Sequence, residues 1–189
     1  SYSKAKVSVR LSMFSVGFFF LIIGLSRPQI GAKLKEHETK GAEIMIVLDV
    51  SNSMLAEDYS PNRLERAKLA ISRLVDKLRE DRIGLIVFAG NSFVQLPITT
   101  DYVSAKMFLN SISTESVPVQ GTAIGEAVNT AMRSFSAQSE KSRAIVVITD
   151  GENHEDDPVA AAQQAAEMGV RVYAIGVGSP EGKPIPMDG

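Results

Sequence analysis

The sequence predicts an α/β fold, a doubly wound and mainly parallel sheet with helices on both faces. Several segments are nearly continuous apolar runs rich in Val and Ile, which is typical of strands buried on both faces. Segments with helical periodicity separate most of these runs. The chain has 189 residues, 44% of them hydrophobic, so it is long enough for one such domain and an additional segment.

The first strand is expected at residues 43–49, EIMIVLD. A loop follows, and then Ser60 and Pro61 predict a helix start, as N-cap and first-turn proline. The helix itself is predicted by apolar residues that recur at helical spacing: Leu64, Ala67, Ile71, Leu74, Val75 and Leu78.

The later elements continue this alternation. A strand at 82–90 precedes a shorter one at 92–98, in which Pro97 favours an edge or a strand end. Thr100 or Asp101 can cap the next helix. The remaining expected elements are helices over 102–112 and 122–135, a strand at 143–150, a helix over 157–169 and a strand at 170–178.

The N-terminal segment is of a different kind. Residues 7–25 contain one charge, Arg10, and no polar stripe. Nineteen helical residues extend roughly 28 Å, close to the hydrocarbon thickness of a bilayer. We therefore predict a flank and transmembrane helix at 1–28, a linker at 29–42 and a globular domain at 43–189. A buried core helix is the alternative, and the absence of a polar stripe disfavours it.

Charge and composition restrict the environment and the partners. The net charge is −2, which gives no general attraction to nucleic acid. The chain has no cysteine, so thiolate metal sites and disulfides are excluded. Short basic flanks on the cytoplasmic side orient membrane spans. Because Lys4, Lys6 and Arg10 come first, we expect the domain outside the cytoplasm.

Two predicted strands end on carboxylates, Asp49 and Asp150. Ligands of doubly wound sheets bind at the carboxyl ends of the strands. Five oxygen-bearing residues are expected there: Asp49, Ser51, Ser53, Thr122 and Asp150. Oxygen donors favour Mg²⁺, Mn²⁺ or Ca²⁺ over Zn²⁺. With two carboxylates and three neutral hydroxyls, the ion would stay electrophilic enough to accept one more carboxylate from outside.

Each of these residues also has a structural explanation. Ser51 and Ser53 could be turn or cap residues, Thr122 could be the N-cap of a helix, and Asp150 with Gly151 could form an ordinary turn. The combination at strand ends is what favours a metal site.

The segments DVSNS, GT and ITDGE resemble the von Willebrand factor A (VWA) family over roughly residues 43–178. The resemblance implies a metal-ion-dependent adhesion site (MIDAS) at the five residues named above. The stretches GLSRPQ, DVSNSMLAEDYSPNRLERAK and GLIVFAGNSFVQLPITTD further resemble the Bat (Bacteroides aerotolerance) membrane proteins, BatA and BatB. That likeness implies a bacterial inner-membrane protein with a periplasmic domain, and a chain that stops before the family's last strand and helix.

The resemblance implies a non-enzymatic module that binds a protein partner through the metal, with other subunits of a membrane complex as candidate partners. One alternative is a Mg²⁺-dependent phosphatase that uses Asp49 as its nucleophile. Ser51 argues against it, since such enzymes carry a second carboxylate there, and neither His37 nor His154 lies in a catalytic constellation. The other alternative is a metal-free structural scaffold. The acidic loop 151–158 is expected to be solvated or to influence partner choice.

Overall fold

The computed structural model describes residues 4–25, 41–137, 139, 141–151 and 156–179; in the first range, side chains are described for 6–22. The chain divides into two units, 1–38 and 39–189. Unit 1 contains helix α1 (Lys4–Leu25), whose large apolar side chains are exposed. Within the described residues, no helix combines the length and the apolarity needed to cross a membrane. The predicted span, 7–25, extends beyond the last described side chain of α1.

Unit 2 contains a five-stranded sheet in the order β3-β2-β1-β4-β5. Neighbouring strands are parallel except for β3, which runs antiparallel to β2 at one edge. The predicted α/β class and the mainly parallel sheet are therefore confirmed. The strands are β1 (Ala42–Asp49), β2 (Arg82–Phe88), β3 (Ser92–Thr99), β4 (Ser142–Thr149) and β5 (Val170–Gly176).

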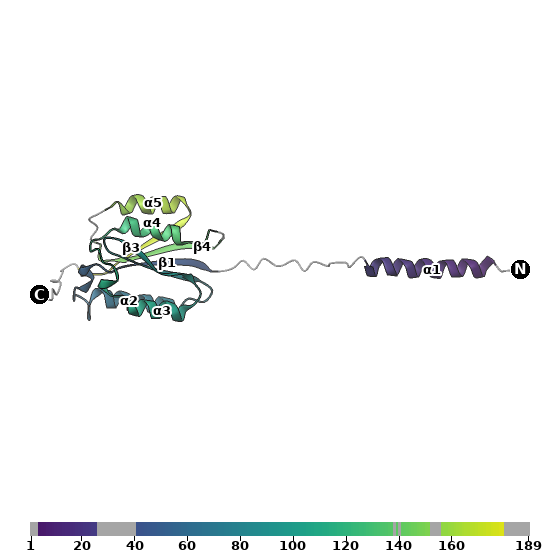
Figure 1. Ribbon diagram of the computed structural model, residues 1–189, viewed down its shortest axis with the longest axis horizontal. Coiled ribbons are helices and arrows are strands. Elements are labelled where there is room, and N and C mark those ends of the chain that lie inside the picture. Colours follow the sequence, from purple (N-terminus) through teal and green to yellow (C-terminus); the bar gives the residue numbers. More distant parts are fainter. Residues whose placement is uncertain (1–3, 26–40, 138, 140, 152–155, 180–189) are drawn as a thin grey trace. The chain divides into compact units, whose positions relative to one another are not determined.

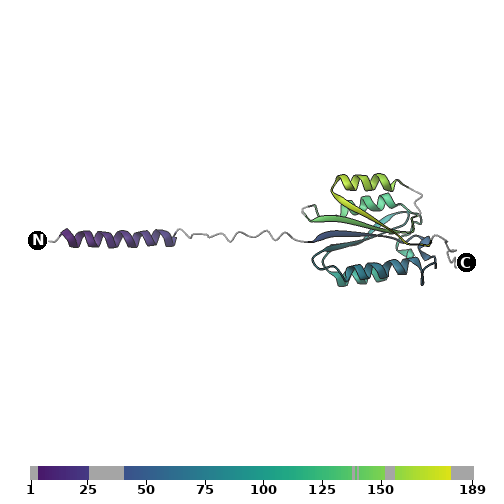
Figure 2. The ribbon, with the colours of Figure 1, turned by 180° about the vertical axis from the view of Figure 1, so that it is seen from behind.

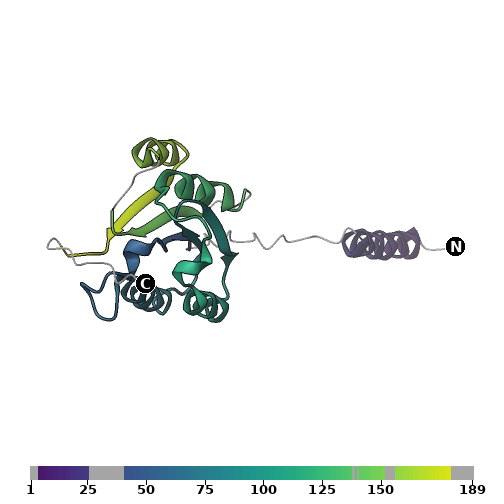
Figure 3. The same ribbon diagram turned by 60° about the vertical axis from the view of Figure 1, so that its left-hand side comes forward.

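Two layers of helices cover the sheet, with α2 and α3 on one face and α4 and α5 on the other (Figure 1). The same layers are visible from behind and after a 60° rotation (Figures 2 and 3). The helices are α2 (Arg63–Val75), α3 (Tyr102–Ser111), α4 (Ile124–Ser134) and α5 (Pro158–Glu167), with short 3₁₀ helices η1 (Asn52–Leu55) and η2 (Thr114–Ser116).

The alternation of side chains along β1 builds two hydrophobic cores. Ile46 and Leu48 pack with α2 and α3, whereas Met45 and Val47 pack with α4 and α5. Because both faces of β1 are covered, the residues between Glu43 and Asp49 are all apolar. This explains the unbroken apolar run from which the strand was predicted.

Two predicted helix starts were wrong. The N-cap of α2 is Asn62, whose side chain accepts a hydrogen bond from the Glu65 N–H, and the helix begins after the Ser60-Pro61 pair. Helix α4 begins at Ile124 with Ala123 as its N-cap, so Thr122 precedes the helix. At α3 the predicted cap is confirmed, since the Asp101 carboxylate accepts from the N–H groups of Val103 and Ser104.

Several predicted features fall outside the described residues: the linker (29–42) except its last two residues, His37, His154, and half of the acidic loop, 152–155. So does the C-terminal stretch 180–189.

Deleting residues 1–28 is expected to leave a folded domain, because the sheet begins at Ala42 and both hydrophobic cores come from later residues. Far-ultraviolet circular dichroism and a cooperative thermal transition would check this result. If the shortened chain shows neither helical nor strand signal, residues 1–28 are needed for folding and the proposed division of the chain is wrong.

Candidate functional site

The C-terminal ends of three parallel strands meet at one edge of the sheet. Asp49, the last residue of β1, is in register with Phe88 on β2, and Leu48 is in register with Ile148 on β4. The connection after β1 runs to β2 on one side, whereas β4 lies on the other side. This reversal of strand order is where doubly wound folds bind ligands.

Asp49 is fully buried at this edge and is surrounded by small hydroxyl groups. Its Oδ1 accepts from the Ser51 hydroxyl at 2.6 Å and from the Ser51 N–H at 2.9 Å. Its Oδ2 accepts from the Thr149 hydroxyl at 2.6 Å. The Ser51 and Ser53 hydroxyls are 2.9 Å apart. We call Asp49, Ser51, Ser53 and Thr149 the hydroxyl cluster.

Among the described residues, no positively charged group donates a hydrogen bond to the Asp49 carboxylate. In the part of the chain that the structure describes, every hydrogen-bond donor to Asp49 is neutral. Burial raises the pKa of Asp49, while the bonds from Ser51 and Thr149 lower it and the nearby charge of Asp150 raises it further. Holding this carboxylate ionised therefore costs free energy unless a cation is added.

Thr122 approaches the same edge from the loop before α4. The Ala123 N–H donates to the Ala89 carbonyl at 2.8 Å, and the Gly90 N–H donates to the Val119 carbonyl at 3.0 Å. Gln120 Oε1 accepts from the Asn52 N–H at 3.1 Å. These contacts hold the buried Thr122 beside the end of β2. Within the described residues, no hydrogen bond joins Thr122 to the hydroxyl cluster.

A glycine is required where this loop meets β2. A Cβ on Gly90 would lie 2.7 Å from the Gln120 carbonyl oxygen and 2.8 Å from a Val119 methyl group. Replacing Gly90 would therefore displace the loop that carries Thr122.

Asp150 lies just past the end of β4 and is held by a cation from another element. Its Oδ2 accepts from Arg63 Nη1 at 2.9 Å, and its side chain is buried. Arg63 also binds Asp58, with Nε–Oδ1 and Nη2–Oδ2 distances of 2.9 Å. We call Asp58, Arg63 and Asp150 the Arg63 cluster.

Residues 44–152 match the von Willebrand factor type A domain. The chain belongs to the VWA family. Two crystal structures are closely similar to its VWA domain. An aerotolerance-related membrane protein from Bacteroides fragilis is 60% identical with a TM-score of 0.76, over 79% of this chain and 74% of the other. BatB from Bacteroides thetaiotaomicron is 62% identical with a TM-score of 0.76, over 79% and 73%. The predicted resemblance to VWA and Bat proteins is thus confirmed.

Curated relatives are more distant and longer. An uncharacterized protein from Borreliella burgdorferi is 33% identical over 176 residues, or 89% of this chain and 51% of its own length. A protein of the UPF0353 group from Mycolicibacterium paratuberculosis is 33% identical over 78% of this chain and 50% of its own length. The chain thus spans about half the length of the curated relatives it matches.

The donor set at the VWA domain's sheet edge suits a hard divalent cation. It combines the Asp49 carboxylate with neighbouring hydroxyls, and Asp150 supplies a second carboxylate nearby. Among the described residues there is no group of three or more His, Asp or Glu side chains placed to hold a metal. The five predicted residues include only two carboxylates, so they do not form such a group.

Three neighbours of the predicted residues had no assigned role from sequence. Thr149 binds Asp49, Arg63 binds Asp150, and Asp58 binds Arg63. A role for Thr149 in the site could have been suspected from sequence, because it directly precedes Asp150 at the end of the same apolar run. No local signal relates Arg63 to Asp150, since 87 residues separate them.

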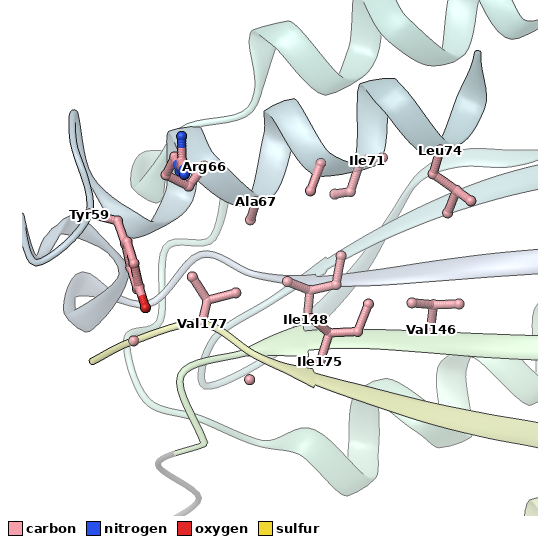
Figure 4. Close-up of a pocket in the computed structure, with 12 residues that line it drawn as sticks. Tyr59, Arg66, Ala67, Ile71, Leu74, Val146, Ile148, Ile175 and Val177 are labelled. Atoms are coloured by element: carbon pink, nitrogen blue, oxygen red, sulfur yellow. The ribbon is translucent and has the colours of Figure 1, made fainter. Parts of the chain in front are cut away.

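An apolar pocket of about 400 Å³ lies between α2 and the strands β4 and β5. Figure 4 shows Ile71 and Leu74 on one side of it and Ile148 and Ile175 on the other. None of the five predicted site residues lines this pocket. Its described lining includes the phenol of Tyr59 and the guanidinium of Arg66 but no carboxylate or imidazole.

Proposed function

We propose that this chain is a divalent-metal-dependent protein-binding module, with Asp49, Ser51, Ser53, Thr122 and Asp150 forming its metal site. The observation that carries the proposal is the buried carboxylate of Asp49, which is surrounded by hydroxyl groups and whose described hydrogen-bond donors are all neutral. A cation supplied from solution would remove the cost of this buried charge. The metal would be Mg²⁺, Mn²⁺ or Ca²⁺, since every donor is oxygen.

The proposed partner is a protein that presents an Asp or Glu side chain. When bound, the ion supplies a Lewis-acidic position that can accept this carboxylate. The chain's own residues orient the site: Thr149 and Ser51 fix both oxygens of Asp49, and the loop attached at Gly90 carries Thr122 to the same edge. The absence of a base among the described contacts of Asp49 favours binding over hydrolysis.

We further propose that residues 7–25 anchor the module in a bacterial inner membrane, with the VWA domain in the periplasm as part of a Bat-type complex. Three facts support the membrane anchor: the apolar run itself, the exposed apolar side chains of α1, and the similar Bacteroides fragilis chain, which is described as a membrane protein. The aerotolerance name of that protein suggests a role in stress resistance.

Thr122→Ala is expected to leave the domain folded and to abolish Mg²⁺-dependent capture of a carboxylate-bearing partner from a membrane extract. Thr122 precedes the helix, so no cap is lost, and removing a hydroxyl and one buried methyl group should cost only about 1 kcal/mol of stability. Thr99→Ala is the matched control, because Thr99 ends β3 at the opposite edge of the sheet.

Capture should be measured for both variants in Mg²⁺ and in EDTA, with mass spectrometry of the bound proteins. Capture that is equally strong in EDTA, or that survives Thr122→Ala, would refute a metal-mediated mechanism. Steady turnover of p-nitrophenyl phosphate with Mg²⁺, lost in Asp49→Asn, would instead favour the phosphatase alternative.

A further inference from the structure

The Arg63 cluster is a buried arrangement of two carboxylates around one guanidinium. Arg63 Nε and Nη2 bind both oxygens of Asp58 at 2.9–3.1 Å, and Nη1 binds Asp150 at 2.9 Å. The side chains of Asp58 and Asp150 are each 1% exposed, and that of Arg63 is 11% exposed. Hydrogen bonds from Arg63 hold the pKa of Asp58 at about 2.

Four segments meet at this cluster. Arg63 is the first residue of α2, Asp58 lies in the loop after η1, and Asp150 follows β4. The segment after β5 joins them, since the Ser179 N–H donates to Asp58 Oδ2 at 2.7 Å. Gly178 packs so closely that a Cβ there would lie 3.3 Å from Arg63 Cζ. The guanidinium is therefore held in place from several sides.

Asp150 belongs to both the Arg63 cluster and the proposed metal site. One of its oxygens is bound by Arg63, and its charge acts on Asp49. A divalent ion at the sheet edge would attract Asp150 and repel the guanidinium that now binds it. At short range in a partly buried site, the removal of one positive charge changes such an interaction substantially.

We propose that Arg63 is a positioning residue that sets the metal affinity of this site. In the metal-free protein it neutralises Asp150 and keeps the sheet edge ordered. When an ion binds, Arg63 competes with it for Asp150, so the affinity is lower than the five oxygen donors alone would give. Asp58 moderates this competition by neutralising Arg63 from the other side. The inference rests on the proposed metal site.

Two opposite effects are expected for Arg63→Gln in the full chain. The dissociation constant for Mn²⁺, measured by isothermal titration calorimetry, should fall about tenfold, because a repelling charge is removed next to the ion. The melting temperature in EDTA should fall as well, because two buried carboxylates lose their cation. If Arg63 had only a structural role, Arg63→Gln would lower stability without tightening metal binding.

Arg66→Gln is the matched control. Arg66 lies one turn along the same helix and is exposed, so this variant removes the same charge without touching Asp150. Its Mn²⁺ affinity should change less than twofold, since exposed charges are screened by solvent and salt. An equal gain in Arg66→Gln would mean that net charge alone sets the affinity, and would overturn the proposal.

Asp58→Asn is a second test variant, and its expected effect on Mn²⁺ affinity is opposite to that of Arg63→Gln. Among the described residues it leaves Asp150 as the one carboxylate that balances the Arg63 charge, so Mn²⁺ binding should weaken several-fold. This result supports the proposal even if Arg63→Gln fails to fold.

Two outcomes overturn the proposal. One is unchanged or weakened Mn²⁺ binding in a folded Arg63→Gln variant, and the other is unchanged Mn²⁺ binding in Asp58→Asn. If the wild-type chain binds no Mn²⁺, the proposed metal site fails, and this inference fails with it. If wild type binds Mn²⁺ and the variants bind it with the same affinity, the inference about Arg63 is refuted but the proposed metal site is not.

Discussion

Asp49→Asn is expected to abolish the stabilisation of the domain by Mg²⁺ while leaving the metal-free protein as stable as wild type or more stable. A ligand present at 100 times its dissociation constant adds about 2.7 kcal/mol of stability by mass action. For a chain of this size that corresponds to a rise in melting temperature of about 5–10 °C. The variant should lose the whole rise, since Asn carries no charge to attract the ion.

The metal-free part of this prediction follows from burial. Asn has the shape of Asp, can accept from Ser51 through Oδ1 and can donate to the Thr149 hydroxyl through Nδ2. It thus keeps a hydrogen bond to Ser51 and, with donor and acceptor exchanged, one to Thr149, and it removes a carboxylate whose pKa is raised chiefly by burial. Removing a charge that is costly to bury does not destabilise the fold when its hydrogen bonds remain.

The difference in stability between wild type and Asp49→Asn, measured in EDTA, should depend on pH. Because the pKa of Asp49 in the folded protein lies above its ordinary value of 3.8, the folded state binds this proton more tightly than the unfolded state. Wild type and Asp49→Asn should therefore be similar below pH 3.8, and the variant should gain relative stability as pH rises through the raised pKa.

Differential scanning fluorimetry with and without Mg²⁺ would measure these effects. Asp76→Asn is the matched control, because Asp76 is an exposed carboxylate that pairs with Lys106 away from the sheet edge. Its Mg²⁺ response should equal that of wild type. A full Mg²⁺ response in Asp49→Asn would rule out Asp49 as a metal ligand.

Arg82→Met is expected to destabilise the domain by about 3–5 kcal/mol, the range found when one partner of a buried ion pair is removed. Glu43 is fully buried at the start of β1, and its Oε1 accepts from Arg82 Nη1 at 2.7 Å. After the substitution, the described partner left for this carboxylate is the Ser136 N–H at 3.3 Å. Arg82 itself is 32% exposed, so the orphaned Glu43 accounts for most of the penalty.

Chemical denaturation would give the free energy of unfolding. The double variant Glu43→Gln with Arg82→Met should recover a large part of the loss, because the amide can be buried without a counter-ion. Arg79→Met, which removes an exposed arginine close by in sequence, should stay within about 0.5 kcal/mol of wild type. A loss below 1 kcal/mol in Arg82→Met would show that Glu43 needs no cation.

The sheet was predictable because strands covered on both faces must be apolar throughout. The runs that became β1, β2 and β4 were recognised for this reason, and Pro97 correctly indicated an edge strand, β3. The helix starts were less predictable, since several residues near each start can act as a cap. At α2, Asn62 makes the capping bond that Ser60 was expected to make. At α4, contacts of the preceding loop with Ala89 and Gly90 fix Thr122 before the first turn.

The candidate site was predictable only where chain order brings residues together. Asp49, Ser51 and Ser53 alternate along an extended segment, and the structure joins them by hydrogen bonds. The contacts of Asp150 were not predictable, because its partner Arg63 comes from another element and no spacing rule relates them. A buried charged pair of this kind becomes visible only once the strands are placed beside one another.

The central position of β1 has a consequence for how fast an ion could enter and leave. Because β1 is hydrogen-bonded to β2 and β4 on both sides, we expect its amides to open for solvent exchange only when the whole domain unfolds. Asp49 is thus anchored to the slowest-exchanging part of the protein. Thr122 and Asp150 lie on connecting segments, which can open separately and more often. The lifetime of a bound ion would then be set by these segments, with the strand that carries Asp49 remaining closed throughout.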